Sequence, residues 1–336
     1  MKSKHILLAH GSGGSMMHDL IKEVFLPAFD NPLLRQGNDL AVLDNPGGRL
    51  AFTTDSYVVH PLVFPGGSIG ELAVHGTIND LAMGGARPLA LSVGMILEEG
   101  LEIRLLEDIV GRMKLAADNA GVPIATGDTK VVERGSCDGM FINTSGIGVV
   151  DESLRIGGAE ARDGDVVILS GTIGDHGVAV MSERKGIRFT TPVKSDTQAL
   201  HRLVAHMLEV TTDIHVLRDP TRGGVATTLN EIAMQSGHGI EIEEDLLPIP
   251  PAVTGACDLL GLDPLYLANE GKLIAIMPAR YADDMIAAMR SLPEGKDSCR
   301  IGRVVTELPG VVRMKTGIGG TRIINVLSGE MLPRIC

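Results

Sequence analysis

Strand-like and helical segments alternate along this chain in two successive sets, separated by a polar, glycine-containing break near Gly157. In the first set, the apolar spacing predicts helices at 16–28, 68–83 and 101–120, and strands at 40–43, 50–53, 89–96 and 140–149. In the second set, it predicts strands at 166–169, 273–277, 300–304 and 311–314, and helices at 176–185, 197–209, 222–236 and 280–291. Each set has its own strands and helices, so the pattern predicts two α+β domains, 1–155 and 156–320, followed by an exposed, mobile tail at 321–336.

The charge balance limits the partners that such a chain can have. Its formal net charge is −12, and a general nucleic-acid binder needs a basic face that neutralises phosphates. A single nucleotide remains possible, because a divalent metal can screen its charge. With 42 Gly and only 3% aromatic residues, we expect a site built from backbone and loops.

The four cysteines, 137, 257, 299 and 336, contain no CxxC pair, which argues against a zinc site or a redox dithiol. Scattered free thiols are typical of a reducing cytoplasm. The apolar run at the N-terminus is too short to export or anchor the chain. We therefore expect a soluble, cytoplasmic protein.

Four aspartates stand in short clusters of small or hydroxyl residues. They are Asp55, Asp80, Asp128 and Asp219. Hard oxygen ligands of this kind suit Mg²⁺, which binds through a few carboxylates and the phosphates of its nucleotide. Each aspartate alone can equally be a turn or cap residue, and Asp80 can lie on an exposed helix face. The set of four favours a metal–phosphate site.

Glycine-rich pieces at 10–14, 171–177 and 222–224 would let backbone N–H groups approach phosphates. None is a P-loop, and ordinary turns explain such pieces as well. Lys130 is a candidate for phosphate contact or proton transfer, or else a solvated lysine. Glu270 is a candidate general base or a polar turn residue. His176, which opens an expected helix between glycines, is the histidine most typical of a site.

Cys336 ends the chain, after Pro333-Arg334-Ile335. A terminal thiol can enter a pocket that an internal cysteine cannot reach, and its thiolate is a nucleophile able to carry a one-carbon group. The alternative is an incidental cysteine at a frayed terminus.

Taken in order, these clusters resemble the superfamily of ATP-dependent aminoimidazole ribonucleotide synthetases and selenophosphate synthetases. The resemblance is strongest to its hydrogenase-maturation branch, the HypE carbamoyl dehydratases. The residues that carry it are His10–Gly14, Thr54–Ser56, Asn79–Pro88, Thr126–Lys130, Asp219–Gly224, Asn269–Gly271 and Pro333–Cys336. The middle motifs are shared across the superfamily and indicate ATP use, whereas the terminal Pro-Arg-Ile-Cys is specific to the branch.

The resemblance implies an N-terminal domain that forms a homodimer through its sheet, and an ATP site in the cleft between the domains. From its apolar character, the strand at 89–93 is a candidate interface element. It implies ATP and Mg²⁺ as cofactors, with metal ligands Asp55, Asp80, Asp128 and Asp219. The nucleotide-binding residues that it implies are Asp55, Asn79, Asp80, Thr126, Gly127, Asp128, Arg222, Gly223 and Gly224. Proton handling falls to Lys130 and Glu270, with His176 in reserve.

The implied reaction takes place on Cys336. Its thiol receives a carbamoyl group from the carbamoyltransferase HypF, ATP phosphorylates the carbamoyl oxygen, and loss of phosphate leaves a thiocyanate. The cyanide then passes to iron on the HypC–HypD complex, for the [NiFe] hydrogenase centre. Two alternatives stay open. A superfamily relative could phosphorylate a free small molecule without needing Cys336, and a nucleotide-responsive scaffold could use the tail only for docking.

Overall fold

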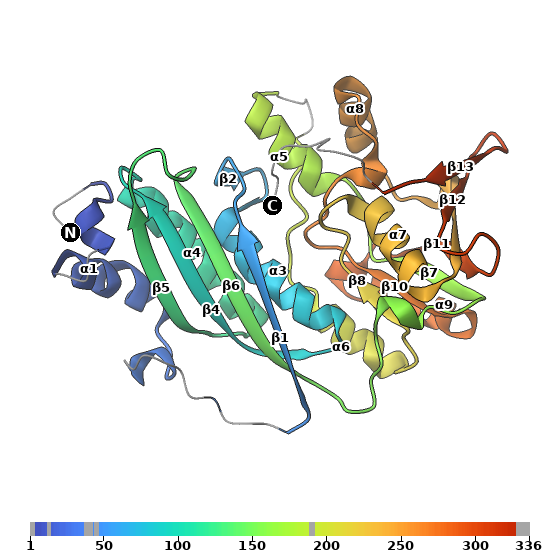
Figure 1. The fold of residues 1–336 in the computed structure, drawn as a ribbon, viewed down its shortest axis with the longest axis horizontal. Coiled ribbons are helices and arrows are strands. Elements are labelled where there is room, and N and C mark those ends of the chain that lie inside the picture. Colours follow the sequence, from blue (N-terminus) through green and yellow to red (C-terminus); the bar gives the residue numbers. More distant parts are fainter. Residues whose placement is uncertain (1–3, 12–14, 37–42, 44–46, 188–191, 327–336) are drawn as a thin grey trace.

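The computed structural model describes residues 4–11, 15–36, 43, 47–187 and 192–326. Two α+β domains lie side by side (Figure 1), as the sequence predicts. None of the helices in these ranges has the length and hydrophobicity that a membrane span requires.

The N-terminal domain is built on a four-stranded sheet in the order β1-β6-β4-β5, in which only β4 and β5 run parallel. Its strands are β1 (Arg49–Tyr57), β4 (Arg87–Glu98), β5 (Ile124–Val132) and β6 (Met140–Val150), with a small hairpin of β2 (Val63–Phe64) and β3 (Gly67–Ser68). Its helices are α1 (Ser15–Leu20), α2 (Leu26–Phe29), α3 (Ile69–Met83) and α4 (Ile103–Ala120). A π-helical turn at Ile21–Phe25 joins α1 to α2, so the expected helix at 16–28 is essentially continuous.

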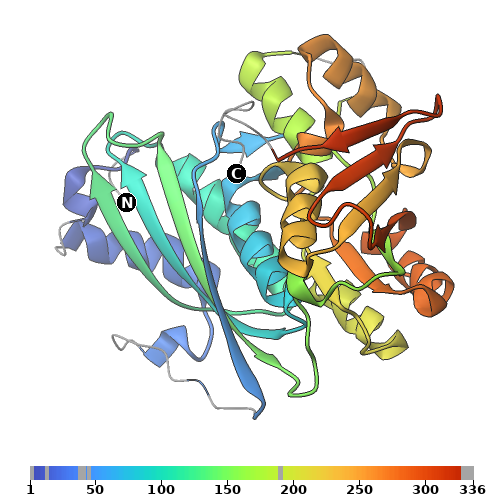
Figure 2. The ribbon, with the colours of Figure 1, turned by 45° about the vertical axis from the view of Figure 1, so that its right-hand side comes forward.

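The C-terminal domain is built on a seven-stranded sheet in the order β13-β12-β9-β11-β7-β10-β8, in which β12 and β9 are the parallel pair. Its strands are β7 (Asp165–Leu169), β8 (Val216–Arg218), β9 (Gly239–Glu243), β10 (Ile274–Pro278), β11 (Cys299–Val305), β12 (Val312–Lys315) and β13 (Thr321–Ile324). Its helices are α5 (Asp175–Lys185), α6 (His201–Val210), α7 (Gly224–Ser236), α8 (Pro251–Leu260) and α9 (Ala282–Arg290). The β12–β13 hairpin forms the outer end of this domain (Figure 2).

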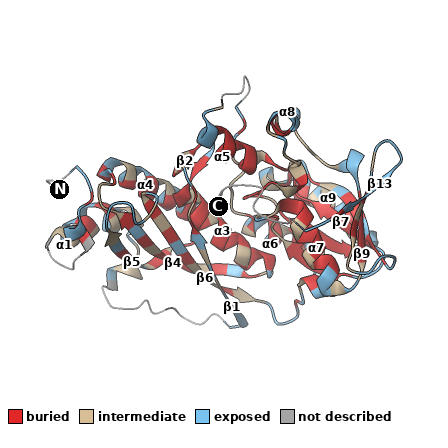
Figure 3. Cartoon of the chain, turned by 45° about the horizontal axis from the view of Figure 1, so that its top comes forward, coloured by how far each residue is buried: buried red, intermediate tan, exposed pale blue. Residues whose placement is uncertain are grey.

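Helix α3 joins the two domains. The side chain of Ser68 caps it by accepting hydrogen bonds from the backbone N–H groups of Gly70 and Glu71. It packs on the sheet and on α4, and also on α6 and β8 of the other domain. Residues on nearly all of its faces are buried, as expected for a helix enclosed on several sides (Figure 3).

Apolar side chains of the two domains pack against each other on both sides of α3. Ala82 and Met83, at its end, belong to the same apolar cluster as Leu203 and Met207 of α6. Val180 of α5 in turn belongs to the core of the N-terminal domain. The acidic residues at this domain boundary are therefore held by a packed interface.

Several sequence predictions need correction. Strands β2, β3, β5, β8, β9 and β13 and helix α8 were not predicted. Asp55 and Asp128 lie inside strands β1 and β5 rather than at loop or strand-end positions. The start of the tail at 321 was placed too early, because Thr321–Ile324 pair with β12 and Ile324 is buried. The strand expected at 40–43 falls almost entirely outside the described residues. In the predicted interface strand, Leu91 and Val93 are buried in the domain's own core.

Candidate functional site

Carboxylates from both domains meet at the boundary that α3 spans. Asp55 comes from β1 and Asp80 from α3, whereas Asp219 directly follows β8 and Glu270 precedes β10. The charges of Asp55, Asp80 and Asp219 all raise the pKa of Glu270, which shows that the four groups share one region. The structure thus brings together three of the four predicted metal ligands and one predicted base.

Asp80 is partly buried near the end of α3. The hydroxyl of Thr53 donates to Asp80 Oδ2 at 2.9 Å. Burial, followed by the charge of Asp219, raises the pKa of Asp80 to about 7, although Thr53 acts in the opposite direction. Burial also raises the pKa of Asp219. Raised pKa values of close carboxyl groups mark a candidate functional site, and a cation bound there would favour their ionised forms.

The raised pKa of Asp80 predicts a pH-dependent effect of Asp80→Asn in the protein free of nucleotide and divalent metal. The unfolded carboxyl titrates near 3.8 and the folded one near 7, so the folded state holds the extra proton between these values and loses stability as pH rises through them. We expect Asp80→Asn to raise the free energy of unfolding by about 2–4 kcal/mol at pH 8 and by much less at pH 4. Urea denaturation at both pH values measures it.

Asp108→Asn, on the exposed face of α4, is the matched control. Asp108 forms a surface ion pair with Arg112 at 2.9 Å, and such pairs contribute about 0–1 kcal/mol. An equal gain for Asp80→Asn at both pH values, or no gain at pH 8, would contradict the raised pKa.

Glu270 is the most deeply buried acid of the cluster, at 4% exposure. Its Oε1 has no hydrogen-bond partner among the described residues. Burial is the main cause of a pKa well above the ordinary value, and the charge of Asp196 is the next. An unbonded, buried carboxylate oxygen is well suited to accept a proton from a substrate.

Asp196 and Lys272 support Glu270, and sequence reasoning missed both. Asp196 Oδ1 accepts a hydrogen bond from the backbone N–H of Glu270 at 3.1 Å. Lys272 Nζ lies 3.7 Å from Asp196 Oδ2, and both side chains are nearly buried. In the sequence, Asp196 stands in a polar run without a motif, so only the fold shows its position.

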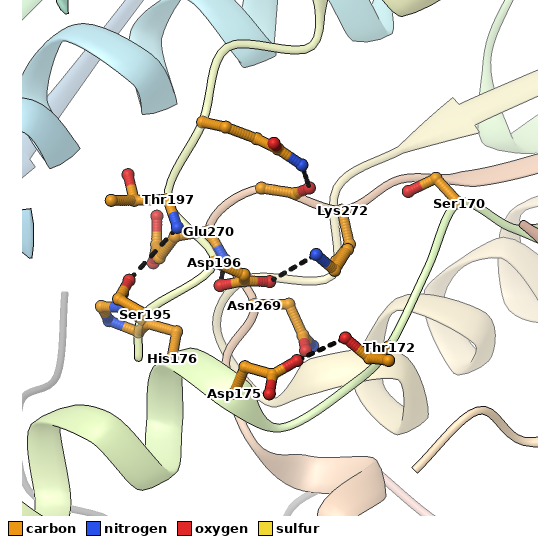
Figure 4. A network of polar contacts seen from close by, with 12 residues as sticks. Ser170, Thr172, Asp175, His176, Ser195, Asp196, Thr197, Asn269, Glu270 and Lys272 are labelled. Carbon is orange, nitrogen blue, oxygen red and sulfur yellow. Dashed lines mark hydrogen bonds and ion pairs between the residues drawn. The ribbon is translucent and has the colours of Figure 1, made fainter. Parts of the chain in front are cut away.

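This pair also lines a polar pocket of about 420 Å³, and Figure 4 shows the polar contacts of the residues around it. Its lining includes Asp196 and Lys272, together with Ser170–Thr172 and Asp175 at the start of α5. Thr172 donates to Asp175 at 2.5 Å, and burial raises the pKa of Asp175. Gly171, Thr172 and Asp175 of the glycine-rich piece at 171–177 therefore line a cavity beside Asp196.

The piece 222–224 lies at the start of α7. Gly223 and Gly224 have φ values of 74° and 60°. A Cβ on Gly224 would lie 2.5 Å from the carbonyl oxygens of Leu265 and Leu267, so this turn requires glycine for close packing. Arg222 is exposed, with its guanidinium 4.0 Å from Asp55. It is therefore free to meet a phosphate.

Asp128 and Lys130 lie elsewhere, together with Thr126 and Gly127. They belong to β5, at the opposite edge of the sheet from β1. Three strand spacings separate the two edges, about 14 Å. Lys130 Nζ is 2.9 Å from Asp128, and both side chains are more than half exposed. The hydrogen bond from Lys130 lowers the pKa of Asp128. Within one chain, these residues do not join the cluster.

His176 and Asn79 have structural contacts. The His176 ring is fully buried, lies 2.8 Å from the Ser195 hydroxyl through Nδ1, and packs edge-on against Phe64 of the N-terminal domain. The amide of Asn79 is bonded to backbone groups of the other domain. Cys336 and part of the 10–14 piece lie outside the described residues.

In the described part of the chain, no three His, Cys, Asp or Glu side chains converge closely enough to hold a metal by themselves. Mg²⁺ usually binds through one or two carboxylates and keeps its other positions for water and phosphate. The acids at the boundary therefore fit an ion that arrives with its nucleotide.

Comparison with known proteins gives consistent matches. Residues 37–150 match the N-terminal domain of the AIR synthase related proteins, and residues 162–315 match the C-terminal domain. The carbamoyl dehydratase HypE of Cupriavidus necator is 56% identical, covering 100% of this chain and 96% of that protein. A crystal structure of the hydrogenase maturation protein HypE in complex with ATP has a TM-score of 0.94 at 52% identity, covering 98% and 99% of the two chains. A HypE–HypF complex has a TM-score of 0.81 at 48% identity, covering 92% and 99%.

Proposed function

Because this chain belongs to the AIR synthase related proteins, in their branch of HypE carbamoyl dehydratases, we propose that it dehydrates an S-carbamoyl group on its own Cys336 to a thiocyanate. ATP drives the reaction, and the product supplies cyanide for the iron of a [NiFe] hydrogenase. The observation that supports the proposal is Glu270, a buried carboxyl group whose Oε1 has no hydrogen-bond partner among the described residues and whose pKa is raised by burial and by acids of both domains.

The chemistry requires an activated oxygen and a base. The carbamoyl oxygen attacks the γ-phosphorus of ATP, ADP leaves, and one N–H proton passes to Glu270. The C–O bond of the resulting phosphate ester then breaks. Phosphate departs with the second proton, and a C≡N bond remains on sulfur. Because Glu270 is buried, its side chain would accept the first proton away from bulk water.

The acids at the boundary would hold Mg²⁺ with the nucleotide through Asp55, Asp80 and Asp219, and the ion would neutralise phosphate charge. The exposed guanidinium of Arg222 and the N-terminus of α7 lie at the same boundary and favour negative charge. The raised pKa values there mean that binding of a cation would release protons.

We further propose that the chain forms a homodimer through the face of the four-stranded sheet that its own helices leave uncovered. Leu50, Phe52 and Ile96 are 60%, 75% and 41% exposed, which is unusual for apolar strand residues. The exposed Asp128 and Lys130 of β5 would then meet a second copy. Sedimentation equilibrium should give a dimer for the wild type and a monomer for Phe52→Glu. A monomeric wild type would exclude this arrangement.

The partners follow from the reaction. A carbamoyl group must reach Cys336 from a carbamoyltransferase, and a HypE relative is known in complex with HypF. We propose HypF as the donor and a HypC–HypD complex as the acceptor of the cyanide.

Intact-mass measurement tests the proposal. The wild type, carbamoylated by its partner and then given Mg-ATP, should first gain a carbamoyl group and then lose one water. The water should stay in place without ATP. A carbamoylated wild type that keeps its water in the presence of Mg-ATP would exclude the dehydratase activity.

A further inference from the structure

Two buried asparagines each precede an acid of the site by one residue. Asn79 stands before Asp80 and Asn269 before Glu270. Their exposures are 1% and 0%. In each pair, the acid faces the shared cluster while the amide is turned into the structure.

The amide of Asn79 crosses the domain boundary. Its Oδ1 accepts a hydrogen bond from the backbone N–H of Leu200 at 2.7 Å. Its Nδ2 donates to the carbonyl oxygens of Gln198 at 3.0 Å and of Glu270 at 3.3 Å. The helix that carries Asp80 is thereby tied to the backbone that carries Glu270.

The amide of Asn269 has the same kind of contacts within the C-terminal domain. Its Oδ1 accepts from the N–H of Gly174 at 2.7 Å, and its Nδ2 donates to the carbonyl oxygens of Pro220 at 3.1 Å and Leu267 at 3.0 Å. Pro220 follows Asp219 directly. This amide therefore ties Glu270 to Asp219, as Asn79 ties it to Asp80.

An asparagine suits this task because one planar group supplies two donors and an acceptor. Each amide here uses both donors and its oxygen on backbone groups. Because these hydrogen bonds hold backbone groups in place, they determine the position from which the neighbouring acidic side chain extends. An amide whose donors and acceptor are all occupied has little left to offer a nucleotide.

We propose that Asn79 and Asn269 are positioning residues, which hold Asp80, Asp219 and Glu270 at fixed separations across the domain boundary, and that neither binds the nucleotide. The inference rests on the proposed dehydration for its kinetic readout. Misplacement of a reacting group by about 1 Å can cost roughly 100-fold in rate, so loss of a tie of this kind should appear in kcat.

The matched control is Asn230 of α7, a third buried asparagine. Its Nδ2 donates to the carbonyl oxygens of Ala226 and Ile324, away from the acids. Asn79→Ala and Asn230→Ala remove the same atoms from the interior. Only Asn79→Ala removes hydrogen bonds that join the backbone segments carrying Asp80 and Glu270.

The experiment compares both variants with the wild type in single-turnover dehydration of the carbamoylated chain, in Mg-ATP binding by calorimetry and in hydrogen exchange. We expect Asn79→Ala to lower the dehydration rate at saturating ATP roughly 30- to 100-fold, to weaken the Kd for Mg-ATP by a smaller factor than the rate, and to speed exchange at 196–200 and 269–272. Asn230→Ala should keep the rate within about threefold.

Other results overturn the proposal. A weaker Kd with an unchanged saturating rate would make Asn79 a nucleotide ligand, and equal rate losses in both variants would make it merely structural. Should Asn79→Ala fail to fold, Gln198→Ala is a milder variant, because it removes only the side-chain donor to the Gly271 carbonyl. A dehydration rate of Gln198→Ala equal to that of the wild type would count against positioning of the segment 269–272. A wild type that does not lose water would refute the dehydration, whereas unchanged exchange in Asn79→Ala would refute the tie itself.

Discussion

Cys336→Ala should abolish both mass changes in the carbamoylation and dehydration assay while leaving Mg-ATP binding intact. The thiol is the proposed carrier of the reacting group, so no substrate forms without it. The acids at the boundary are held by contacts among residues 53–272, so we expect the nucleotide site to form without the terminal thiol. We expect the Kd for Mg-ATP within about twofold of the wild type, and a Tm shift of no more than about 1 °C, since terminal residues are usually tolerant.

The other three cysteines are poor substitutes for Cys336. Burial raises the pKa of Cys137 and of Cys299, and that of Cys257 to about 11. Their thiols are therefore mostly protonated near neutral pH, and the thiolate is the nucleophile. Cys137→Ser, the matched control, should gain the carbamoyl group and lose water like the wild type.

The same variants separate the alternatives. A gain of carbamoyl in Cys336→Ala would place the carrier elsewhere. Equal ATP turnover by Cys336→Ala and wild type on a free small molecule would favour a phosphotransferase. Binding of the partner without any mass change in the wild type would favour a scaffold.

The fold and part of the site could be predicted from local pattern. The apolar spacing of residues 68–83 is strong enough to predict α3, and this prediction places Asp80 on that helix. Asp219 was singled out by its polar, glycine-containing cluster, and it lies directly after β8, a strand that the pattern did not predict. These positions depend on neighbours close in sequence, which is the information that a pattern contains.

The missed elements depend on distant residues. Glu241 lies in the middle of β9 and is only 3% exposed, and a buried acid weakens the pattern of a strand. Its charge is balanced by Arg303, Arg313 and Lys315 from neighbouring strands, at 3.1, 2.9 and 2.8 Å. Similarly, β5 is an edge strand whose exposed, glycine-containing face looks like a loop. Neither arrangement can be inferred before the strands are paired.

The site was incomplete for the same reason. Asp196 is 74 residues away from Glu270 in sequence, yet the two are joined by a hydrogen bond. The sequence also grouped Asp128 with the other aspartates by motif, although its strand lies at the far edge of the sheet. Motifs indicate which residues take part, whereas the fold decides which of them meet within one chain.

Glu270→Gln should reduce the dehydration of carbamoylated Cys336 by roughly 10²–10⁴-fold, the usual contribution of a general base. Glutamine has nearly the same shape and leaves the backbone contacts of residue 270 with Asp196 and Asn79 in place, but it cannot accept the N–H proton. Carbamoylation and the Kd for Mg-ATP should stay within a few-fold. Intact mass measures the dehydration and the carbamoylation, and calorimetry measures the Kd for Mg-ATP. Glu107→Gln on the exposed face of α4 is the control.

The pH dependence distinguishes a base from a packing residue. Because burial and the nearby acids hold the pKa of Glu270 well above its ordinary value, the wild-type rate should rise with pH until the carboxyl is ionised. The residual rate of Glu270→Gln should lack that rise. The variant should also unfold with a higher free energy at alkaline pH, where the wild type must keep a buried charge. A variant that dehydrates at the wild-type rate would remove Glu270 from the chemistry and leave the exposed Lys130, from a second copy, as the remaining proton-transfer candidate.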